Sequence, residues 1–453
     1  APIRAKFCIK KYCIMRREIY SKLLLWKNNP NRKPLIITGA RQVGKTWIMR
    51  EFGKNEYEEV VYINCDNESR MEKLLSDDYN IDRILLGLQA ISGINIKENK
   101  TLIIFDEIQQ IPRGLHLLKY FYEEAPNYHI MVAGSLLGIT LNQGTSFPVG
   151  KVDMIDMHPM NFTEFLDAIG QEQFRKILDT QDWSLIDSLS TKFIEFLRQY
   201  YYVGGMPEAV DSYCKYKDLA QVRSIQNNIL KAYRNDISKH TTKTESVKIG
   251  QVLDSLPSQL SKENKKFIYG VVKNGARASE YELAIQWLID AGIVHKVNRI
   301  KEAKMPIKFY EDISAFKLFL LDLGLFACMC DVPAAEMLIG DNVFVEYKGA
   351  FAEEYVLQQL ICQNIKPYYW SSDRSPAEID FIIQHENKIV PIEVKAEVNV
   401  RARSLRQFIN DNPSLKACRF SMLGYADQDW MINVPLYSVC HFSSLKLGFG
   451  LFI

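Results

Sequence analysis

The chain has 453 residues, of which 47% are hydrophobic and 24% are charged, and its formal net charge is +2. This composition is typical of a globular protein rather than a disordered or fibrous one, and the length predicts roughly three domains. Because the net charge is so small, it gives no evidence for a nucleic-acid or membrane partner. No stretch approaches the roughly 18 consecutive apolar residues of a membrane span, and we expect no signal peptide because no apolar run follows the basic N-terminus.

The nine cysteines are scattered along the chain and form no CxxC pair. This pattern argues against a disulfide framework and against a zinc site. We therefore expect a protein of a reducing compartment, located in the cytoplasm and without a membrane partner.

Residues 1–33 form a basic N-terminal segment in which ten Lys and Arg residues stand against Glu18 alone. Two interpretations are open. The segment is either an arm that contacts phosphates or a solvated basic helix.

Residues 34–170 alternate short apolar runs with amphipathic segments. The runs predict strands at 35–38, 60–63, 102–105, 130–133 and 152–156. Near-continuous apolar strands separated by helices are typical of a parallel sheet covered on both faces. We predict an α/β domain here.

A glycine-rich loop follows the first of these strands and precedes a helical pattern. It reads Gly39-x-x-x-x-Gly44-Lys45-Thr46, and its backbone N–H groups are expected to surround phosphates. Lys45 is expected to reach the β- and γ-phosphates of ATP, and Thr46 to bind Mg²⁺. The predicted nucleotide contacts are Gly39, Ala40, Arg41, Gln42, Val43, Gly44, Lys45, Thr46 and Trp47. Arg41 has a second interpretation, in which it points outward to a neighbouring domain or subunit.

An acidic pair, Asp106 and Glu107, ends the strand at 102–105. Asp106 fits a Mg²⁺ partner and Glu107 fits the group that orients the attacking water; the alternative is two acidic residues that favour a helix start. Ser135 follows the next predicted strand and is either a sensor of the γ-phosphate or part of a Gly-Ser turn. Arg234 is the first candidate for a catalytic arginine and Arg113 the second.

Residues 171–238 turn helical and predict a lid, in which Gly204, Gly205 and Pro207 mark a helix end and a new helix start. Residues 239–310 resemble a winged helix and end in a predicted hairpin. Its candidate DNA-phosphate contacts are Lys265, Lys266, Lys273, Arg277, Lys296, Arg299, Lys301 and Lys304. A protein-docking module is the alternative.

Residues 311–453 contain "EIDFII" and "PIEVKA", two predicted strands that bring Asp380, Glu393 and Lys395 to one face. The carboxylates, with the Val394 carbonyl, would hold Mg²⁺, and Lys395 would act on water. The alternative is an amphipathic hairpin with a charged solvent face. The spacing resembles the PD-(D/E)xK nuclease-like fold, also called restriction-endonuclease-like, and this resemblance implies that Glu353 is its early acidic residue.

Five motifs in order carry a wider resemblance: "LIITGARQVGKT", "LIIFDEIQ", "VAGSLLG", "HPMNFTEFL" and "YVGGMPEAV". Together they resemble a bacterial and archaeal group of AAA-type P-loop ATPases close to the STAND-like class. The resemblance covers roughly Arg32 to Val398. It implies an ATPase core, a helical lid, a winged-helix-like unit and a nuclease-like tail.

Three functions are open at this point. The first is a Mg²⁺-dependent ATPase coupled to DNA binding or remodelling. The second is an ATP-gated, metal-dependent DNA nuclease. The third is a nucleotide-dependent switch whose tail binds without cutting. An arginine acting between subunits would imply a homo-oligomer or a partner protein, whereas STAND-like ATPases can also rest as closed monomers.

Overall fold

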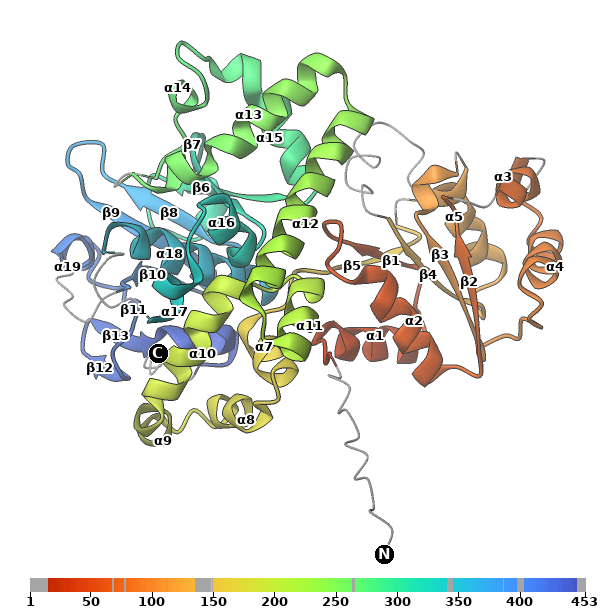
Figure 1. The fold of residues 1–453 in the computed structure, drawn as a ribbon, viewed down its shortest axis with the longest axis horizontal. Coiled ribbons are helices and arrows are strands. Elements are labelled where there is room, and N and C mark those ends of the chain that lie inside the picture. Colours follow the sequence, from red (N-terminus) through yellow and green to blue (C-terminus); the bar gives the residue numbers. More distant parts are fainter. Residues whose placement is uncertain are drawn as a thin grey trace, which may run out of the picture.

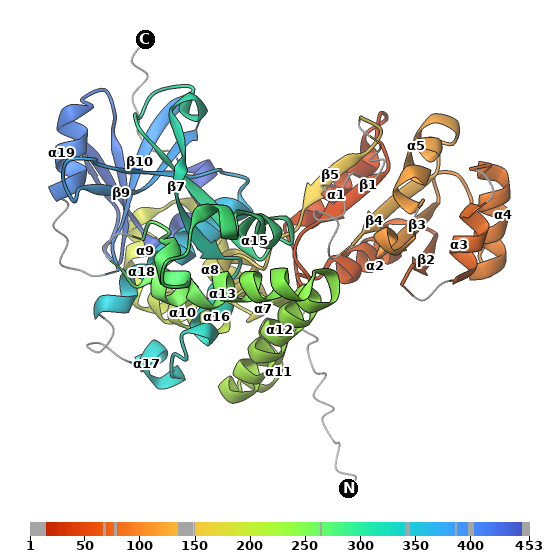
Figure 2. The same cartoon turned by 90° about the horizontal axis from the view of Figure 1, so that it is seen from above.

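The computed structural model describes residues 15–66, 69–76, 79–111, 113–134, 148, 150–262, 265–339, 345–385, 387–396 and 403–445. Two sheets lie at opposite ends of the molecule, with the long helix α12 (Leu219–His240) between them (Figures 1 and 2). Among these residues no helix is both long and apolar enough to cross a membrane.

The N-terminal sheet, sheet A, is parallel throughout and has the strand order β2-β3-β4-β1-β5. Its strands are β1 (Leu35–Thr38), β2 (Glu59–Asn64), β3 (Thr101–Asp106), β4 (His129–Ala133) and β5 (Asp153–Asp156). These bounds confirm the five predicted strands to within one residue. The prediction succeeds because the central strands are buried on both faces and so are apolar without interruption.

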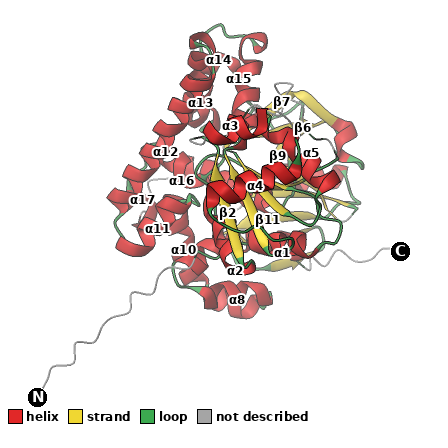
Figure 3. Cartoon of the chain, turned by 90° about the vertical axis from the view of Figure 1, so that its right-hand side faces the viewer, coloured by secondary structure: helices red, strands yellow, loops and turns green. Residues whose placement is uncertain are grey.

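Helices cover both faces of sheet A. Alternate residues of β3 separate the two layers, since Leu102 and Ile104 face one helix group and Ile103 and Phe105 the other. The first group is α1 (Ile19–Asn28) and α2 (Lys45–Glu56), and the second is α3 (Ser69–Ser76), α4 (Ile81–Ser92) and α5 (Gly114–Glu124). Figure 3 views the molecule from this end. Because α1 contributes to the core, the described part of the basic N-terminal segment is integral to the domain.

The central region is helical, as predicted for the lid. Its helices are α7 (Phe162–Ala168), α8 (Glu172–Thr180), α9 (Trp183–Ser188), α10 (Ser190–Val203), α11 (Pro207–Tyr216) and α12. The turn between α10 and α11 contains Gly204, whose φ of +73° favours glycine. The next N–H, of Gly205, donates to the buried Asp322 carboxylate at 2.6 Å. Burial raises the pKa of Asp322 to about 6.

A second sheet, sheet B, has eight strands in the order β12-β13-β11-β10-β9-β8-β6-β7. The strands are β6 (Val294–Ile300), β7 (Glu311–Leu320), β8 (Tyr368–Ser371), β9 (Glu378–His385), β10 (Lys388–Val394), β11 (Ala417–Ser421), β12 (Ala426–Gln428) and β13 (Met431–Pro435). The associated helices are α13 (Lys243–Leu260), α14 (Tyr269–Val272), α15 (Ala278–Asp290), α16 (Leu323–Met329), α17 (Ala334–Ile339), α18 (Val345–Cys362) and α19 (Arg403–Asp411). Short 3₁₀ helices occupy Ile108–Gln110, Ile307–Tyr310 and Leu436–Ser444.

The domain boundary predicted at residue 310 falls within sheet B, between the strands β6 and β7. Strands β6 and β7 form an antiparallel hairpin, and β6 also pairs with β8 through Arg299 opposite Tyr369. The hairpin predicted to end a small helical domain therefore also forms one side of the C-terminal sheet.

Candidate nucleotide-binding site

The glycine-rich loop connects β1 to α2, in the strand–loop–helix context that phosphate binding requires. Gly39 has a φ of +132°, and a Cβ there would lie 2.2 Å from the Met157 carbonyl oxygen, so only glycine fits. Gly44, with a φ of +98°, caps the N-terminus of α2. The loop therefore presents backbone N–H groups at the carboxyl edge of sheet A.

The Lys45 ammonium lies on the loop itself. Its Nζ donates to the carbonyl oxygens of Gly39 and Ala40, both at 2.7 Å. Burial lowers the pKa of Lys45 to about 8, and the charges of Glu107 and Asp106 oppose this effect only in part. Among the described residues Lys45 forms no ion pair, and a phosphate group would supply a negative partner at contact distance.

The two predicted Mg²⁺ partners are in direct contact. Thr46 Oγ1 donates to Asp106 Oδ2 at 2.6 Å, and the Tyr62 hydroxyl donates to the same oxygen at 3.0 Å. Adjacent β2 and β3 bring Tyr62 to Asp106, and burial raises the pKa of Tyr62 to about 12. The structure thus joins Thr46 and Asp106, which are 60 residues apart in sequence, and adds Tyr62, which the sequence analysis missed.

Glu107 adopts a left-handed backbone conformation with a φ of +54°. Such a conformation is costly for a residue with a side chain and is enriched at functional sites. Gln109 Nε2 donates to Glu107 Oε2 at 2.5 Å, and the charge of this carboxylate acts on the Lys45 ammonium. The position fits a group that orients water.

Two other predicted catalytic residues, Arg234 and Arg113, have partners outside the loop. Arg234 pairs with Asp254 of α13 on an exposed surface, so its guanidinium does not contact the loop. Arg113 Nε donates to the Tyr79 hydroxyl at 2.9 Å and lies over the Tyr79 ring. Ser135 lies outside the described residues. The roles predicted for these three residues stay predictions.

The loop is held from outside by residues that no motif indicated. Arg41 pairs with Asp236 of α12, and the Tyr233 hydroxyl donates to the Arg41 carbonyl at 3.0 Å. This contact agrees with the outward interpretation of Arg41. Arg17 donates to the carbonyl oxygen of Val43 at 2.9 Å and forms a buried ion pair with Glu164 at 3.1 Å.

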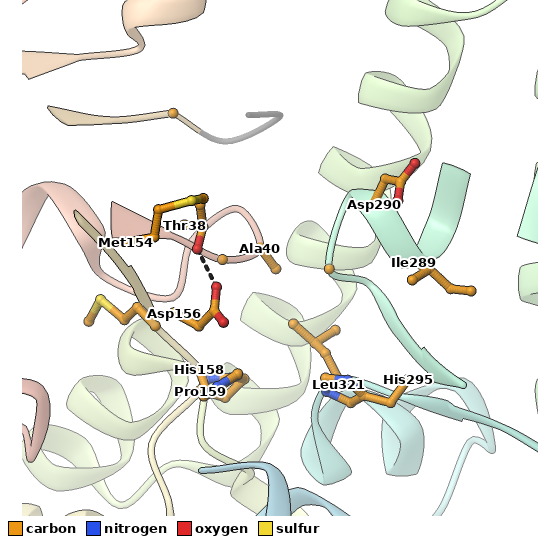
Figure 4. A pocket seen from close by; sticks show the side chains of 14 residues that line it. Thr38, Ala40, Met154, Asp156, His158, Pro159, Ile289, Asp290, His295 and Leu321 are labelled. Carbon is orange, nitrogen blue, oxygen red and sulfur yellow. Dashed lines mark hydrogen bonds between the residues drawn. The ribbon is translucent and has the colours of Figure 1, made fainter. Parts of the chain in front are cut away.

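A cavity of about 280 Å³ lies beside the loop, between β1, β5 and the turn from α15 to β6 (Figure 4). Thr38 donates to Asp156 at its edge. Across the cavity, burial and the neighbouring His158 lower the pKa of His295 to about 3, so this imidazole is neutral at physiological pH. A Cβ on Gly292 would lie 3.1 Å from the Ala40 nitrogen, so the α15–β6 turn touches the loop directly.

The residues predicted to hold a metal in the C-terminal region lie together on sheet B and α18, and one oxygen of each carboxylate contacts another group of the chain. Asp380 Oδ2 accepts the Val394 N–H at 2.7 Å, and Lys395 Nζ lies 2.6 Å from Glu393 Oε1. Burial and the charges of Glu353 and Glu393 raise the pKa of Asp380 well above its ordinary range. Glu353 pairs with lysines, and within the described ranges no three or more His, Cys, Asp or Glu side chains form a group that could hold a metal ion.

Comparison with known families divides the chain into three matches. Residues 31–166 match an AAA domain family, residues 194–336 a domain of unknown function (DUF8612), and residues 348–437 a second domain of unknown function (DUF4143). No curated protein matches the chain at a significant level.

Similar solved structures include the Walker-type ATPase PABY2304 of Pyrococcus abyssi, at 15% identity, over 70% of this chain and 96% of that chain, with a TM-score of 0.44. The Aeropyrum pernix Orc1 protein in complex with DNA follows at 12% identity, over 73% and 97%, with a TM-score of 0.28. Cdc6p of Pyrobaculum aerophilum gives 12% identity, over 74% and 96%, with a TM-score of 0.27. At these TM-scores the likenesses carry no functional argument. The family match and the geometry of the loop agree that residues 31–166 form an AAA-type domain with a P-loop ATPase-like fold.

Proposed function

We propose that the protein binds ATP at the loop of residues 39–46 and hydrolyses it with Mg²⁺. The contact between Thr46 Oγ1 and the buried Asp106 carboxylate carries this proposal, because it places two hard oxygen donors beside the phosphate loop. When bound there, Mg²⁺ would neutralise charge on the β- and γ-phosphates.

Each residue of the site has a separate task in this proposal. The loop N–H groups bind the phosphates, and Lys45 leaves the Gly39 and Ala40 carbonyls to pair with them. Glu107 orients the attacking water and accepts its proton. Gln109 fixes the Glu107 carboxylate for this task.

We further propose that the nucleotide state is passed to the rest of the chain and coupled to DNA binding or remodelling. Three contacts support a mechanical route: Arg41 with Asp236 on α12, Tyr233 with the Arg41 carbonyl, and the Gly292 turn against Ala40. Since β6 follows Gly292 directly, a shift of the loop would reach sheet B within a few residues.

The DNA-facing surface in this proposal is smaller than the sequence predicted. Three of the eight predicted phosphate contacts form ion pairs within the chain: Lys265, Arg299 and Lys304. The Lys296 ammonium lies over the Phe316 ring. We assign phosphate contact to three exposed cations of this set, Lys273, Arg277 and Lys301. Phosphate contact by these residues is sequence-independent, so we expect DNA binding without base specificity.

One observation favours the switch with a non-cutting tail as the second candidate function. The succession α18–β8–β9–β10–α19–β11 is compatible with the nuclease-like fold proposed for residues 311–453. Glu353 and Glu393 are nevertheless paired with lysines of the same chain, and Asp380 accepts the Val394 N–H, which argues against the ATP-gated nuclease in this conformation. The switch uses the same nucleotide site, and its ATP turnover does not depend on DNA.

The deciding experiment is ATP turnover with and without duplex DNA, run beside a plasmid-cleavage assay in Mn²⁺. We expect Lys45→Ala to lose binding and turnover, and Glu107→Gln to keep binding while turnover falls about 10²-fold or more. A DNA-stimulated rate supports coupling to DNA, whereas an unchanged rate supports the switch. Absence of ATP binding by calorimetry would refute the central proposal, and Mn²⁺-dependent cleavage would restore the nuclease.

A further inference from the structure

The long helix α12 contacts Arg41 of the phosphate loop twice. The Arg41 guanidinium pairs with the Asp236 carboxylate, and the Tyr233 hydroxyl donates to the Arg41 carbonyl oxygen at 3.0 Å. Tyr233 and Asp236 are three residues apart on α12, so they lie on one face of this helix. Because separate contacts hold the backbone and the side chain of Arg41, the side chain can leave α12 while the backbone stays attached.

The Arg41 guanidinium lies close to the groups that handle the phosphates. The Lys45 ammonium donates to the carbonyl oxygen of Ala40, the residue directly before Arg41. Burial is the main cause of the lowered pKa of Lys45, and the positive charge of Arg41 adds to it. The hydrogen bond with Asp236 raises the pKa of Arg41, and the charge of Glu107 acts in the same direction. Since Glu107 is the residue assigned to the attacking water, Arg41 faces the side of the loop at which a γ-phosphate would lie.

The two partners of the Arg41–Asp236 ion pair differ in burial. The Asp236 side chain is 8% exposed and belongs to a helix, whereas the Arg41 side chain is 47% exposed. An ion pair with a half-exposed partner is weak because water screens it. A phosphate group can accept two parallel N–H donors from a guanidinium, and such bidentate pairs are among the strongest charge-assisted hydrogen bonds. A γ-phosphate would therefore compete with Asp236 for Arg41.

Arg17, which also contacts the loop, is not a comparable candidate. It is 6% exposed, donates to the Val43 carbonyl oxygen and pairs with Glu164. If it left this position, the buried Glu164 carboxylate would lose its cation, which is costly. Arg17 is thus a fixed support of the loop, whereas Arg41 can change its partner.

We propose that Arg41 stabilises the γ-phosphate of ATP within its own chain, and that Asp236 holds it away from that position in the nucleotide-free protein. The inference rests on the ATP hydrolysis proposed above. ATP draws the guanidinium from α12 onto the γ-phosphate oxygens. ADP has no γ-phosphate, so Arg41 stays with Asp236, and the contact with α12 distinguishes the two nucleotides.

Arg41 forms and breaks no covalent bond in this step. Water attacks the γ-phosphorus and passes a proton to Glu107, the bond between the γ-phosphorus and the β–γ bridging oxygen breaks, and ADP and inorganic phosphate leave. The guanidinium neutralises charge on the γ-phosphate oxygens while this occurs. Asp236 acts only through Arg41 and is therefore a positioning residue.

The test combines steady-state ATP turnover by the full chain with calorimetry of ADP and of AMP-PNP, an ATP analogue that is not hydrolysed. Arg41→Ala should lower kcat about 10³-fold, as expected for an arginine that acts on the γ-phosphate, and should weaken AMP-PNP binding more than ADP binding. Asp236→Asn should tighten AMP-PNP binding about fivefold, because a weak ion pair no longer competes for Arg41. It should also lower the KM of ATP and affect ADP less. Asp254→Asn is the matched control, because it removes another ion pair of α12, with Arg234, and should change none of these quantities.

A merely structural role of the pair would alter ADP and AMP-PNP binding alike, because both nucleotides use the same loop. Equal changes in the two affinities in Asp236→Asn, or a wild-type kcat in Arg41→Ala, would therefore overturn the inference. If Arg41→Ala does not fold, Arg41→Lys keeps the charge, loses the bidentate contact and should still lower kcat. If the wild type binds both nucleotides without turnover, the affinities alone decide. Absence of nucleotide binding in the wild type would instead refute the function proposed above.

Discussion

Nucleotide binding at the P-loop is expected to take up protons through Lys45. Burial holds the pKa of this ammonium at about 8, against an ordinary value of 10.5. The bound phosphates would favour the charged form and return the pKa toward or above its ordinary value. At pH values between the two pKa values, the nucleotide-free protein binds fewer protons than the nucleotide complex. Nucleotide binding must therefore consume protons over the window from about pH 8 to 10.5.

The magnitude follows from the fraction of Lys45 that is neutral before binding. With a pKa of about 8, uptake should be about 0.1 proton at pH 7, about 0.5 at pH 8 and about 0.9 at pH 9. The same lowered pKa makes the ammonium unfavourable in the nucleotide-free fold. This cost is fully present below pH 8 and is relieved as the pH rises toward 10.5.

The assay is calorimetry of ADP binding in buffers of different ionisation enthalpy, repeated at pH 7, 8 and 9. The slope of binding heat against ionisation enthalpy gives the number of protons taken up. Lys45→Arg is the control, because arginine stays charged over this range and should show no uptake. A slope that does not rise from pH 7 to 9, or an equal slope in Lys45→Arg, would refute the assignment of Lys45 as the buried phosphate partner.

Two further predictions concern the contacts around the loop. Asp236→Asn removes the ion pair with the half-exposed Arg41 and should lower the free energy of unfolding by about 1 kcal/mol. A double-mutant cycle with Arg41→Ala, measured by urea unfolding, should give a coupling energy of similar size. If the effects of the two single variants simply add, the two residues do not interact. Gly292→Ala and Gly275→Ala meet similar positive φ values of +71° and +76° and should each cost about 1–2 kcal/mol. Only Gly292→Ala should also weaken ADP binding in calorimetry, because its Cβ reaches the Ala40 nitrogen, whereas a Cβ at Gly275 meets open space. Equal ADP affinities of the two variants would contradict the contact between Gly292 and the loop.

The core of sheet A was predictable because its signals are local. Buried parallel strands are apolar runs, and the P-loop needs glycines at fixed spacing, so both are visible in a short window of sequence. The meeting of Thr46 with Asp106 follows from the same order of motifs. Thr46 follows β1 and Asp106 ends β3, and these two parallel strands, which flank β4, end at the same edge of the sheet.

The contacts that join the loop to the rest of the chain carry no local signal. Arg17 reaches Glu164 over 147 residues, and Arg41 reaches Asp236 over 195. A single arginine has no periodicity, and its partner depends on the packing of whole helices. Lys265 illustrates the same limit, because the basic segment predicted it as a DNA-phosphate contact, whereas the fold pairs it with Glu353.

The way sheet B is assembled also limits how this protein can be divided or recombined. A truncation at residue 310 would remove β7 and β8, the two neighbours of β6, and leave an unpaired strand that invites aggregation. A separately expressed tail beginning at residue 311 would lose β6 from between β7 and β8, and Lys265 as well. The carboxyl-terminal half therefore cannot be exchanged as a cassette at that point, and chimaeras that retain function are expected to keep residues 243–445 together.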